Sequence, residues 1–473
     1  MYMKKHYVSL SDKALDFINA EEISRTLEYA KEHKNDKGLI ADIMSKAREK
    51  NGLYHEEAAV LLLNNDPEVT SEIKALAEEI KLAYYGNRIV LFAPLYLSNF
   101  CINGCTYCPY HAKNKQIPRL KMTQEQIADE VRALQKMGHK RLALEAGEDP
   151  KNNPLEYILE SIATIYGVHE EGVIRRVNVN IAATTIENYK RLHAAKIGTY
   201  ILFQETYNKK DYEKLHPRGP KSDYLWHTEA MDRAMQGGFE DVGLGVLFGL
   251  HSYEYELVGL LMHAEHLEAV YGAGPHTISV PRLRPADDID VSSFKNALPD
   301  DVFLKLIALL RVAVPYTGMI MSTRESEHIR KEALSLGISQ ISGGSKTTVG
   351  GYANQNAAID NSAQFEVSDN RTLDEVVRWL MECGHVPSFC TACYGSGRQG
   401  VDFMEICKKK QIHHYCTRNA LLTLMEYVNK YASPETRRIG TALLDHEFDK
   451  LSPKSADELI RRINTTTNEI KFF

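Results

Sequence analysis

Apolar residues follow a helical spacing in the first part of the chain. Residues 1–88 are largely polar, with amphipathic spans near 21–32 and 56–84. Such spans are typical of helices that lay one face on a neighbouring core. We therefore expect a helical N-terminal extension over residues 1–88.

From residue 89 the pattern changes to short apolar runs that alternate with segments of helical period. The expected strands are 89–98, 141–148, 176–182, 199–207, 242–250, 276–283, 318–325 and 338–344. The expected helices between them are 123–137, 153–166, 185–196, 222–236, 254–270, 299–314 and 326–336. Near-continuous apolar strands joined by crossover helices indicate a parallel sheet. Eight of them predict an α/β fold, a closed (βα)8 TIM-type barrel over residues 89–350.

The alternation ends near residue 350. Residues 351–473 are expected to form an appended C-terminal domain of helices and cysteine-bearing loops. A chain of 473 residues, 44% hydrophobic and 25% charged, has the composition of a globular protein that needs no disulfides.

Charge and hydropathy exclude some partners. The net charge is −6 and no block of Lys or Arg occurs, so nucleic acid is not an expected partner. The start, MYMKKHYVSL, lacks a signal segment, and no apolar run reaches the roughly 18 residues that a membrane span needs. We expect a cytoplasmic protein without a membrane partner.

The eight cysteines fall into two clusters, which favours metal binding over disulfides. The first array, Cys101, Cys105 and Cys108 in FCINGCTYCPYH, follows the first expected strand. Active sites of (βα)8 barrels lie at the carboxyl ends of the strands. Three thiolates can hold three irons of a [4Fe–4S] cluster and leave the fourth iron open, whereas a structural zinc site would need a fourth ligand.

With Tyr107 at its aromatic position, this array resembles the C-x3-C-x-aromatic-C signature of the radical S-adenosylmethionine (SAM) superfamily. The resemblance implies that SAM chelates the open iron and that one electron cleaves SAM to a 5′-deoxyadenosyl radical. A donor such as ferredoxin or flavodoxin would supply the electron. Ala146, Gly147 and Glu148 occupy the place of the G-G-E motif that holds the methionine amine, with alanine as a departure.

The second array is Cys390, Cys393 and Cys416, spaced C-x2-C-x22-C. Its spacing alone leaves two interpretations open, an iron–sulfur site, with Cys407 and Cys383 nearby as possible fourth ligands, or a structural zinc site completed by His413 or His414.

Three further segments carry a second resemblance: LFQETYN (202–208), GPHTISVPRLRPA (274–286) and MSTRES (321–326). Together with the second array they are similar to the HydG family, the radical SAM tyrosine lyases of [FeFe]-hydrogenase maturation, over essentially the whole chain. The thiazole-pathway tyrosine lyases (2-iminoacetate synthases) resemble the barrel alone and lack the second array.

The resemblance implies that Cys390, Cys393 and Cys416 hold an auxiliary [4Fe–4S] cluster. The sulfur of a free L-cysteine would bridge its open iron to a labile fifth iron. It assigns no role to Cys383 or Cys407.

The family also implies a barrel histidine that helps to hold the labile iron. His276 opens the sixth expected strand, at the barrel floor, where an appended domain can close it. His266 and His263, on the preceding helix, are the alternatives, and we expect His276.

The implied reaction begins with hydrogen abstraction from the amino group of L-tyrosine. Cleavage of the Cα–Cβ bond gives p-cresol and dehydroglycine, and the auxiliary site converts dehydroglycine to CO and cyanide. The product would be an Fe(CO)(CN) synthon for the H-cluster, passed to other hydrogenase maturation proteins. The alternatives are a thiazole-pathway-type tyrosine lyase, a radical SAM lyase on another amino acid, or an iron–sulfur scaffold or carrier.

Polar residues at strand ends complete the expected site. Arg324 offers a bidentate partner for the tyrosine carboxylate, or else forms a salt bridge with Glu325 or Glu327. Glu205 is a candidate for contact with SAM or the substrate amine, since a carboxylate in an apolar strand needs a partner. Arg282 is a candidate for contact with SAM or substrate.

Overall fold

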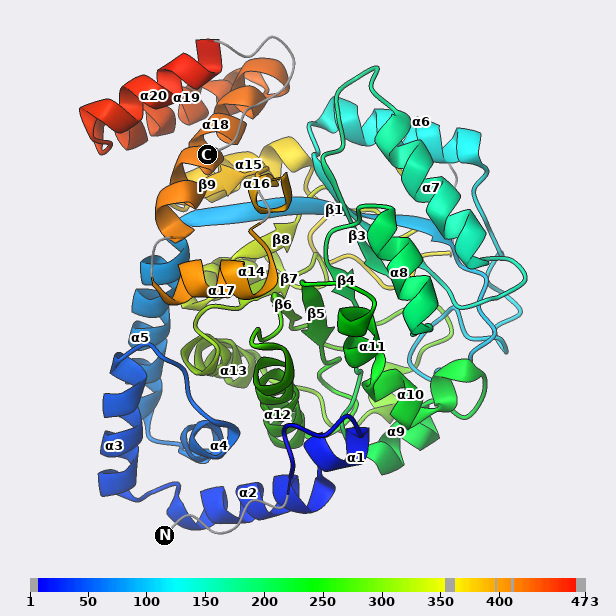
Figure 1. Ribbon diagram of the computed structural model, residues 1–473, viewed down its shortest axis with the longest axis vertical. Coiled ribbons are helices and arrows are strands. Elements are labelled where there is room, and N and C mark those ends of the chain that lie inside the picture. Colours follow the sequence, from blue (N-terminus) through cyan, green and yellow to red (C-terminus); the bar gives the residue numbers. More distant parts are fainter. Residues whose placement is uncertain (1–6, 354–361, 396–397, 410–411, 465–473) are drawn as a thin grey trace.

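The computed structural model describes residues 7–353, 362–395, 398–409 and 412–464. Within these ranges, nine parallel strands form one sheet in the order β2-β3-β4-β5-β6-β7-β8-β1-β9, and β1 also pairs with β2. The strands are β1 (Arg88–Ser98), β2 (Arg141–Ala146), β3 (Arg176–Asn180), β4 (Tyr200–Ile201), β5 (Val242–Gly245), β6 (Thr277–Ser279), β7 (Gly318–Met321), β8 (Gln340–Ser342) and β9 (Val386–Ser388). Because β1 pairs with both β8 and β2, the first eight strands close into the predicted barrel (Figure 1).

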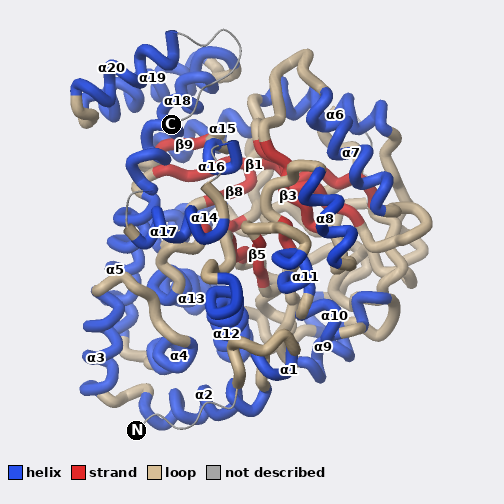
Figure 2. The backbone as a smooth tube through the Cα atoms, in the orientation of Figure 1, coloured by secondary structure: helices blue, strands red, loops and turns tan. Residues whose placement is uncertain are grey.

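Helices surround this barrel, as the backbone tube shows (Figure 2). They are α6 (Gln124–Met137), α7 (Leu155–Gly167), α8 (Ile186–Ala194), α9 (Lys209–Leu215), α10 (Tyr224–Thr228), α11 (Ala230–Gln236), α12 (Tyr253–Tyr271), α13 (Asp300–Ala313) and α14 (Glu327–Leu336). Six of them, α6, α7, α8, α12, α13 and α14, begin and end within two residues of the predicted bounds. The predicted helix 222–236 is instead two short helices that meet at Glu229, and α9 was not predicted.

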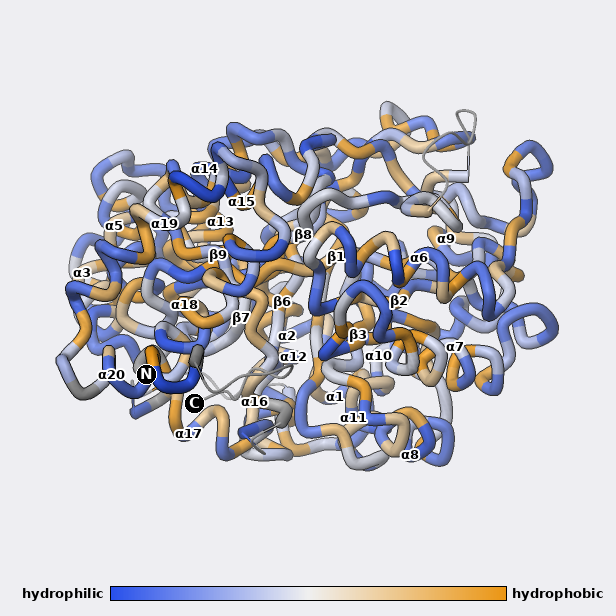
Figure 3. The backbone as a smooth tube through the Cα atoms, turned by 90° about the horizontal axis from the view of Figure 1, so that it is seen from above, coloured by the Kyte–Doolittle hydropathy of each residue, from blue (hydrophilic) through white to orange (hydrophobic). Residues whose placement is uncertain are grey.

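The apolar runs of the strands are buried as the parallel-sheet pattern requires. Leu142, Leu144, Val177, Val179 and Ile278 have no exposed surface. Hydrophobic stretches accordingly run through the central strands, including β6 and β7, while hydrophilic residues dominate the peripheral loops (Figure 3).

The fourth strand is much shorter than the predicted 199–207. The strand itself is Tyr200–Ile201, followed by a single parallel bridge between Glu205 and Val246, and the chain leaves extended geometry at Glu205, whose φ is +68°. This conformation is rare for a residue with a side chain and is common where function constrains the backbone. A run of apolar residues does not indicate where the backbone leaves the extended conformation.

The N-terminal helices are α1 (Ala14–Phe17), α2 (Ala20–His33), α3 (Lys37–Arg48), α4 (His55–Leu63) and α5 (Pro67–Tyr85). The predicted span 56–84 is divided into α4 and α5, because Asp66 caps α5 and Pro67 occupies its first position. Helices α2 and α4 pack on α12, and α5 packs on α13 and α14, so the extension covers one side of the barrel (Figure 1).

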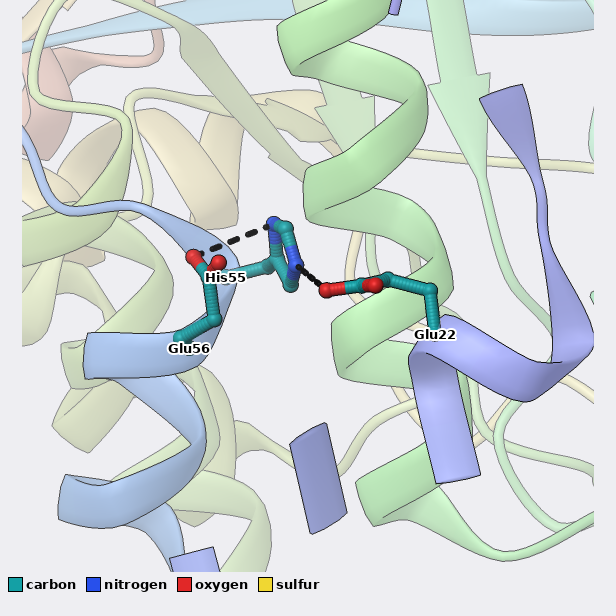
Figure 4. Close-up of side chains that lie close together, drawn as sticks. All are labelled: Glu22, His55 and Glu56. Atoms are coloured by element: carbon teal, nitrogen blue, oxygen red, sulfur yellow. Dashed lines mark ion pairs between the residues drawn. The ribbon is translucent and has the colours of Figure 1, made fainter. Parts of the chain in front are cut away.

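A buried ion cluster joins this extension to the barrel (Figure 4). The Nδ1 atom of His55 lies 2.9 Å from Glu265 of α12 and 3.6 Å from Glu56, and its Nε2 atom lies 3.6 Å from Glu22 of α2. Burial alone would lower the pKa of His55, but the neighbouring carboxylates of Glu22 and Glu265 raise it to about 9. The protonated ring therefore supplies the positive charge among these carboxylates.

The cysteine-bearing segments of the C-terminal part lie at the amino-terminal ends of the barrel strands, here called the floor, where Cys390 and Cys416 line a cavity with Arg88 of β1 and Arg141 of β2. The helices of the C-terminal part are α15 (Leu373–Glu382), α16 (Ala392–Gly395), α17 (Gly400–Lys408), α18 (Ile412–Lys430), α19 (Pro434–Asp449) and α20 (Pro453–Asn464). Strand β9 pairs with the start of β1, where Arg88 faces Val386, and α18 packs on β9, β1 and α5. Strand β9 was not predicted, since it has three residues and includes Pro387, which cannot donate to a ladder.

Within the described residues, no helix combines the length and the apolar character that crossing a membrane requires.

Candidate functional site

A cavity lies at the carboxyl ends of the strands, here called the mouth cavity. Of the predicted site residues, its lining includes Cys101, Cys105, Tyr107, Cys108, Ala146, Gly147, Glu148, Glu205 and Arg324. They come from the loop after β1 and from the ends of β2, β4 and β7, which is where a (βα)8 barrel carries its chemistry.

The cysteine loop is anchored by backbone hydrogen bonds. The N–H of Gly104 donates to the carbonyl of Arg218 (2.9 Å), and the N–H of Thr106 donates to the carbonyl of Leu215 (3.0 Å). The guanidinium of Arg119 donates to four carbonyls of the same loop, at 2.7 to 3.2 Å. The cysteines therefore sit on a preorganised segment, and neither Arg119 nor the 215–218 segment was singled out from the sequence.

The three thiols share a desolvated position. Burial raises the pKa of Cys101 and Cys105, and raises the pKa of Cys108 to about 12. Clustered thiols of this kind lose their protons when a metal centre replaces them. The donor set therefore fits an iron–sulfur cluster.

Gly147 is required by a close approach to the cysteine loop. A Cβ atom there would lie 2.4 Å from the carbonyl oxygen of Phe100 and 3.1 Å from Cβ of Cys101. The next residue, Glu148, accepts a hydrogen bond from Nδ2 of Asn103 at 2.6 Å. The second glycine of the G-G-E motif thus has a steric reason here.

Tyr107 is held by a hydrogen bond as well as by packing. The Nδ1 atom of His216 lies 2.8 Å from the carbonyl of Tyr212, so Nδ1 carries the proton. The pKa of His216 is lowered to about 3 by burial, so Nε2 accepts a hydrogen bond from the hydroxyl of Tyr107 at 2.7 Å. No pattern in the sequence points to His216.

Glu205 finds its partner in Lys221, at 2.7 Å. Burial alone would lower the pKa of Lys221, but Glu205 and Cys105 raise it. Lys221 also lines the mouth cavity. A charged pair thus lies beside the thiols, and its lysine was not identified from the sequence because it follows no strand.

Arg324 lies deep in the mouth cavity, with its guanidinium carbon 3.5 Å from the ring centre of Phe365. Among the described residues, Glu325 pairs with Arg282 and Arg284, and Glu327 pairs with Arg371. The alternative salt bridge of Arg324 with Glu325 or Glu327 is therefore not formed.

Arg282 is not brought to the mouth cavity. Its guanidinium donates to Glu325 (3.0 Å), to Asp300 (2.6 Å) and to the carbonyl of Leu298 (2.9 Å). These hydrogen bonds hold the loop after β6. Arg284, two residues further along the chain, lines the mouth cavity, and Arg282 does not.

Glu145 is a site residue that the sequence reading missed. It lines the mouth cavity and a second cavity inside the barrel, which also contains Arg324 and Tyr96. Burial raises the pKa of Glu145 to about 8, against the opposing effects of Asn180 and Arg324. A lone Glu in the apolar strand RLALEA was the available signal.

A third cavity lies at the floor and is lined by the second array, Cys390, Cys393 and Cys416, together with His276. Burial raises the pKa of Cys390 to about 11 and that of Cys393 to about 12. We call it the floor cavity.

One ring nitrogen of His276 lies near a carboxylate, as is usual for a histidine that binds a metal through its other ring nitrogen. Its Nδ1 atom lies 3.3 Å from Asp241, which also accepts a hydrogen bond from the N–H of Gly400 at 3.2 Å. Burial would raise the pKa of Asp241, but the neighbouring His276 lowers it. A carboxylate on one ring nitrogen orients the other nitrogen toward a metal.

The two alternative histidines do not line the floor cavity. His266 contacts Asp232 (2.9 Å) and stacks on Phe17, and His263 contacts the hydroxyl of Tyr207 (3.0 Å). Both lie beneath the N-terminal segment.

The cysteine sulfurs are spread more widely than a single ion requires. In the described part of the chain, the one group of three ligand atoms within 4.8 Å of one another is Glu22, His55 and Glu56. A tetrahedral zinc with bonds of about 2.3 Å would bring its thiolates within about 4 Å of each other. The side chains of His413 and His414 lie outside the described residues.

Neither remaining cysteine lines the floor cavity. Cys407 is buried near Cys416 and Cys393, and Cys383 lies at the end of α15.

Known proteins match this arrangement. Residues 95–264 match the radical SAM superfamily, and residues 279–386 match the biotin and thiamin synthesis associated domain. A crystal structure of HydG, a maturase of the [FeFe]-hydrogenase, is 50% identical, with a TM-score of 0.93 over 97% of this chain and 100% of that one. HydG from Carboxydothermus hydrogenoformans is 37% identical, with a TM-score of 0.81 over 95% and 99% of the two chains. The 2-iminoacetate synthase of Salmonella typhimurium is 29% identical over 74% of this chain and 90% of its own length.

Proposed function

Because the chain belongs to the HydG family of [FeFe]-hydrogenase maturases, we propose that it cleaves L-tyrosine at Cα–Cβ to p-cresol and dehydroglycine. It then converts dehydroglycine to CO and cyanide and assembles them into an Fe(CO)(CN) synthon for the H-cluster. The observation that carries this proposal is a pair of three-cysteine cavities at opposite ends of one barrel.

Cys101, Cys105 and Cys108 would hold the [4Fe–4S] cluster to which SAM binds. When bound, the cluster and SAM supply the one-electron chemistry and the radical that side chains cannot provide. Glu148 accepts a hydrogen bond from the methionine amine of SAM. Asn103 holds the carboxylate of Glu148 in place by donating a hydrogen bond to it. Gly147 lets this motif approach the cysteine loop.

The barrel residues orient the tyrosine. Arg324, which has no carboxylate partner among the described residues, binds the substrate carboxylate with its planar fork. Glu205 accepts from the substrate amine, and Lys221 pairs with that carboxylate at 2.7 Å. Glu145, with a pKa of about 8, carries a proton at neutral pH beside the path into the barrel.

Cys390, Cys393 and Cys416 would hold an auxiliary [4Fe–4S] cluster, at which free L-cysteine would bind. His276, whose Nδ1 lies 3.3 Å from Asp241, would help to hold the labile iron. Dehydroglycine reaches this site through the cavity inside the barrel. A ferredoxin or flavodoxin supplies electrons, and other maturation proteins receive the product.

The decisive experiment is anaerobic incubation of the reconstituted protein with SAM, dithionite and L-tyrosine. We expect p-cresol, CO and cyanide, and about eight or nine irons per chain. About four irons with one zinc would refute the auxiliary cluster, and absence of SAM cleavage would favour a scaffold or carrier.

The similarity to 2-iminoacetate synthase supports one alternative, a thiazole-pathway-type tyrosine lyase. That activity would give p-cresol without CO or cyanide. Product from another amino acid, with tyrosine unreactive, would identify a different radical SAM lyase.

A further inference from the structure

Arg88 is a buried cation at the floor cavity that pairs with no carboxylate among the described residues. It is the first residue of β1, is 8% exposed and lines the cavity beside the second cysteine array. Its Nε atom is buried without a hydrogen-bond partner, and no carboxylate among the described residues pairs with it. Its guanidinium lies 5.3 Å from the ring centre of Tyr85. Buried charges are otherwise paired, so Arg88 requires an anion from outside the chain.

The surroundings of Arg88 strengthen this requirement. Arg141 also lines the cavity and donates to the carbonyl of Cys390 at 2.9 Å. Lys81 is buried nearby, and its pKa is lowered to about 8 by burial and by the charges of Arg311 and Arg88. No Asp or Glu is found among the described residues that line the cavity. The floor cavity is therefore a positively charged site.

The thiolates of the second array account for only part of the missing negative charge. They would be engaged by the auxiliary cluster, and sulfur is a weak acceptor for a guanidinium. The planar fork of arginine matches a carboxylate, which accepts two parallel hydrogen bonds.

We propose that Arg88 binds the carboxylate of the small thiol-bearing amino acid whose sulfur reaches the auxiliary cluster. This inference rests on the proposed function, which places free L-cysteine at that cluster. The positive surroundings favour the carboxylate over the ammonium group near Arg88, so the ligand is selected for its acidic end as well as for its sulfur.

The test measures selectivity for the carboxylate. The protein carries Cys105→Ala, so that only the auxiliary cluster contributes to the electron paramagnetic resonance spectrum. L-cysteine and cysteamine, which lacks the carboxylate, are titrated separately, and the Kd per cluster is read from the spectral change. We expect Arg88→Gln to weaken L-cysteine binding by about 10–100-fold and to leave cysteamine binding unchanged. Arg88→Lys should lie between, because it keeps the charge and loses the fork.

A matched control is Arg175→Gln, which removes another partly buried guanidinium near the floor, paired with Glu426 and outside the cavity lining. It should leave the cysteine-to-cysteamine ratio unchanged. Equal weakening of both ligands by Arg88→Gln, or an unchanged ratio, overturns the proposal. If Arg88→Gln does not hold its cluster, the ratio in Arg88→Lys decides in the same way. If L-cysteine leaves the spectrum of the parent protein unchanged, the proposed function itself fails at this step.

Discussion

The mouth and floor cavities each hold three thiols but surround them with different charges. Around the mouth array lie both the carboxyl groups of Glu145, Glu148 and Glu205 and the cations Lys221, Arg284 and Arg324. Around the floor array lie the guanidiniums of Arg88 and Arg141. Carboxylates suit a ligand that presents an amine, and guanidiniums suit one that presents an acid. An equal number of cysteines therefore does not imply equal external ligands.

The largest effect should come from removing one cluster at a time. Cys105→Ala should abolish SAM cleavage and p-cresol formation, a loss of at least about 1000-fold, because without the cluster the catalytic electron is lost. Cys393→Ala should keep p-cresol formation within about threefold and abolish CO. Product quantification with iron counts tests this pair. Equal loss of both products in Cys393→Ala would break the division between the cavities.

Gly147→Ala should damage the mouth cavity alone. Its Cβ atom would meet the carbonyl of Phe100 at 2.4 Å, and backbone cannot yield as a side chain can. We expect p-cresol formation to fall by about 100-fold, with about four irons retained at the floor. Ala146→Gly, which restores the G-G-E motif, is the control and should retain activity. Loss of floor iron in Gly147→Ala would show that the two sites are not independent.

Arg324→Ala should separate substrate binding from SAM binding. Removing a buried guanidinium that pairs with the tyrosine carboxylate should raise the KM for tyrosine by about 30-fold or more. Binding of SAM, measured on the cluster by spectroscopy, should be unchanged. Arg324→Lys should recover part of the loss. Unchanged tyrosine kinetics would remove Arg324 from the site.

Asp241→Asn should act at the floor alone, through His276. Loss of the carboxylate that orients the ring should weaken retention of the labile iron by about 10-fold. Iron counts before and after mild chelation measure this, with p-cresol formation as the internal control. Iron retention equal to that of the parent protein would show that His276 needs no such support.

The smallest effect on either cavity should come from His55→Gln. This substitution changes the stability of the protein at a position remote from both cysteine arrays. The pKa of His55 is raised to about 9 in the folded protein, above the ordinary value of 6.5. Its contribution to the free energy of unfolding is therefore complete below about pH 6.5 and is lost as the pH rises through about 9, amounting to as much as about 3 kcal/mol. Denaturant titrations at pH 6.5 and pH 9.5 should show a difference between the two proteins that shrinks at the higher pH. A difference that grows with pH would mean that His55 is neutral in the folded state.

The first set of cysteines was predictable because its spacing is local, whereas Cys416 was joined to Cys390 and Cys393 by the family resemblance. Cys101, Cys105 and Cys108 span eight residues, and one loop after one strand places them together. The barrel was predictable for a related reason, since each strand and helix carries its own hydrophobic period. The break at Glu205 was not predictable, because a backbone torsion leaves no trace in an apolar run.

The sequence by itself determined the alternation of strands and helices, the two thiol arrays and the end of the barrel to which each belongs. Only the tertiary structure decided the charged neighbours. Lys221 meets Glu205, Asp241 meets His276, and Arg88 lines the cavity of Cys390 and Cys416, across separations that no local pattern encodes. The physical reason is that barrel closure brings the starts of distant strands together at one end and their carboxyl ends together at the other. Periodicity specifies each element, whereas the electrostatics of a site depend on which elements closure makes neighbours.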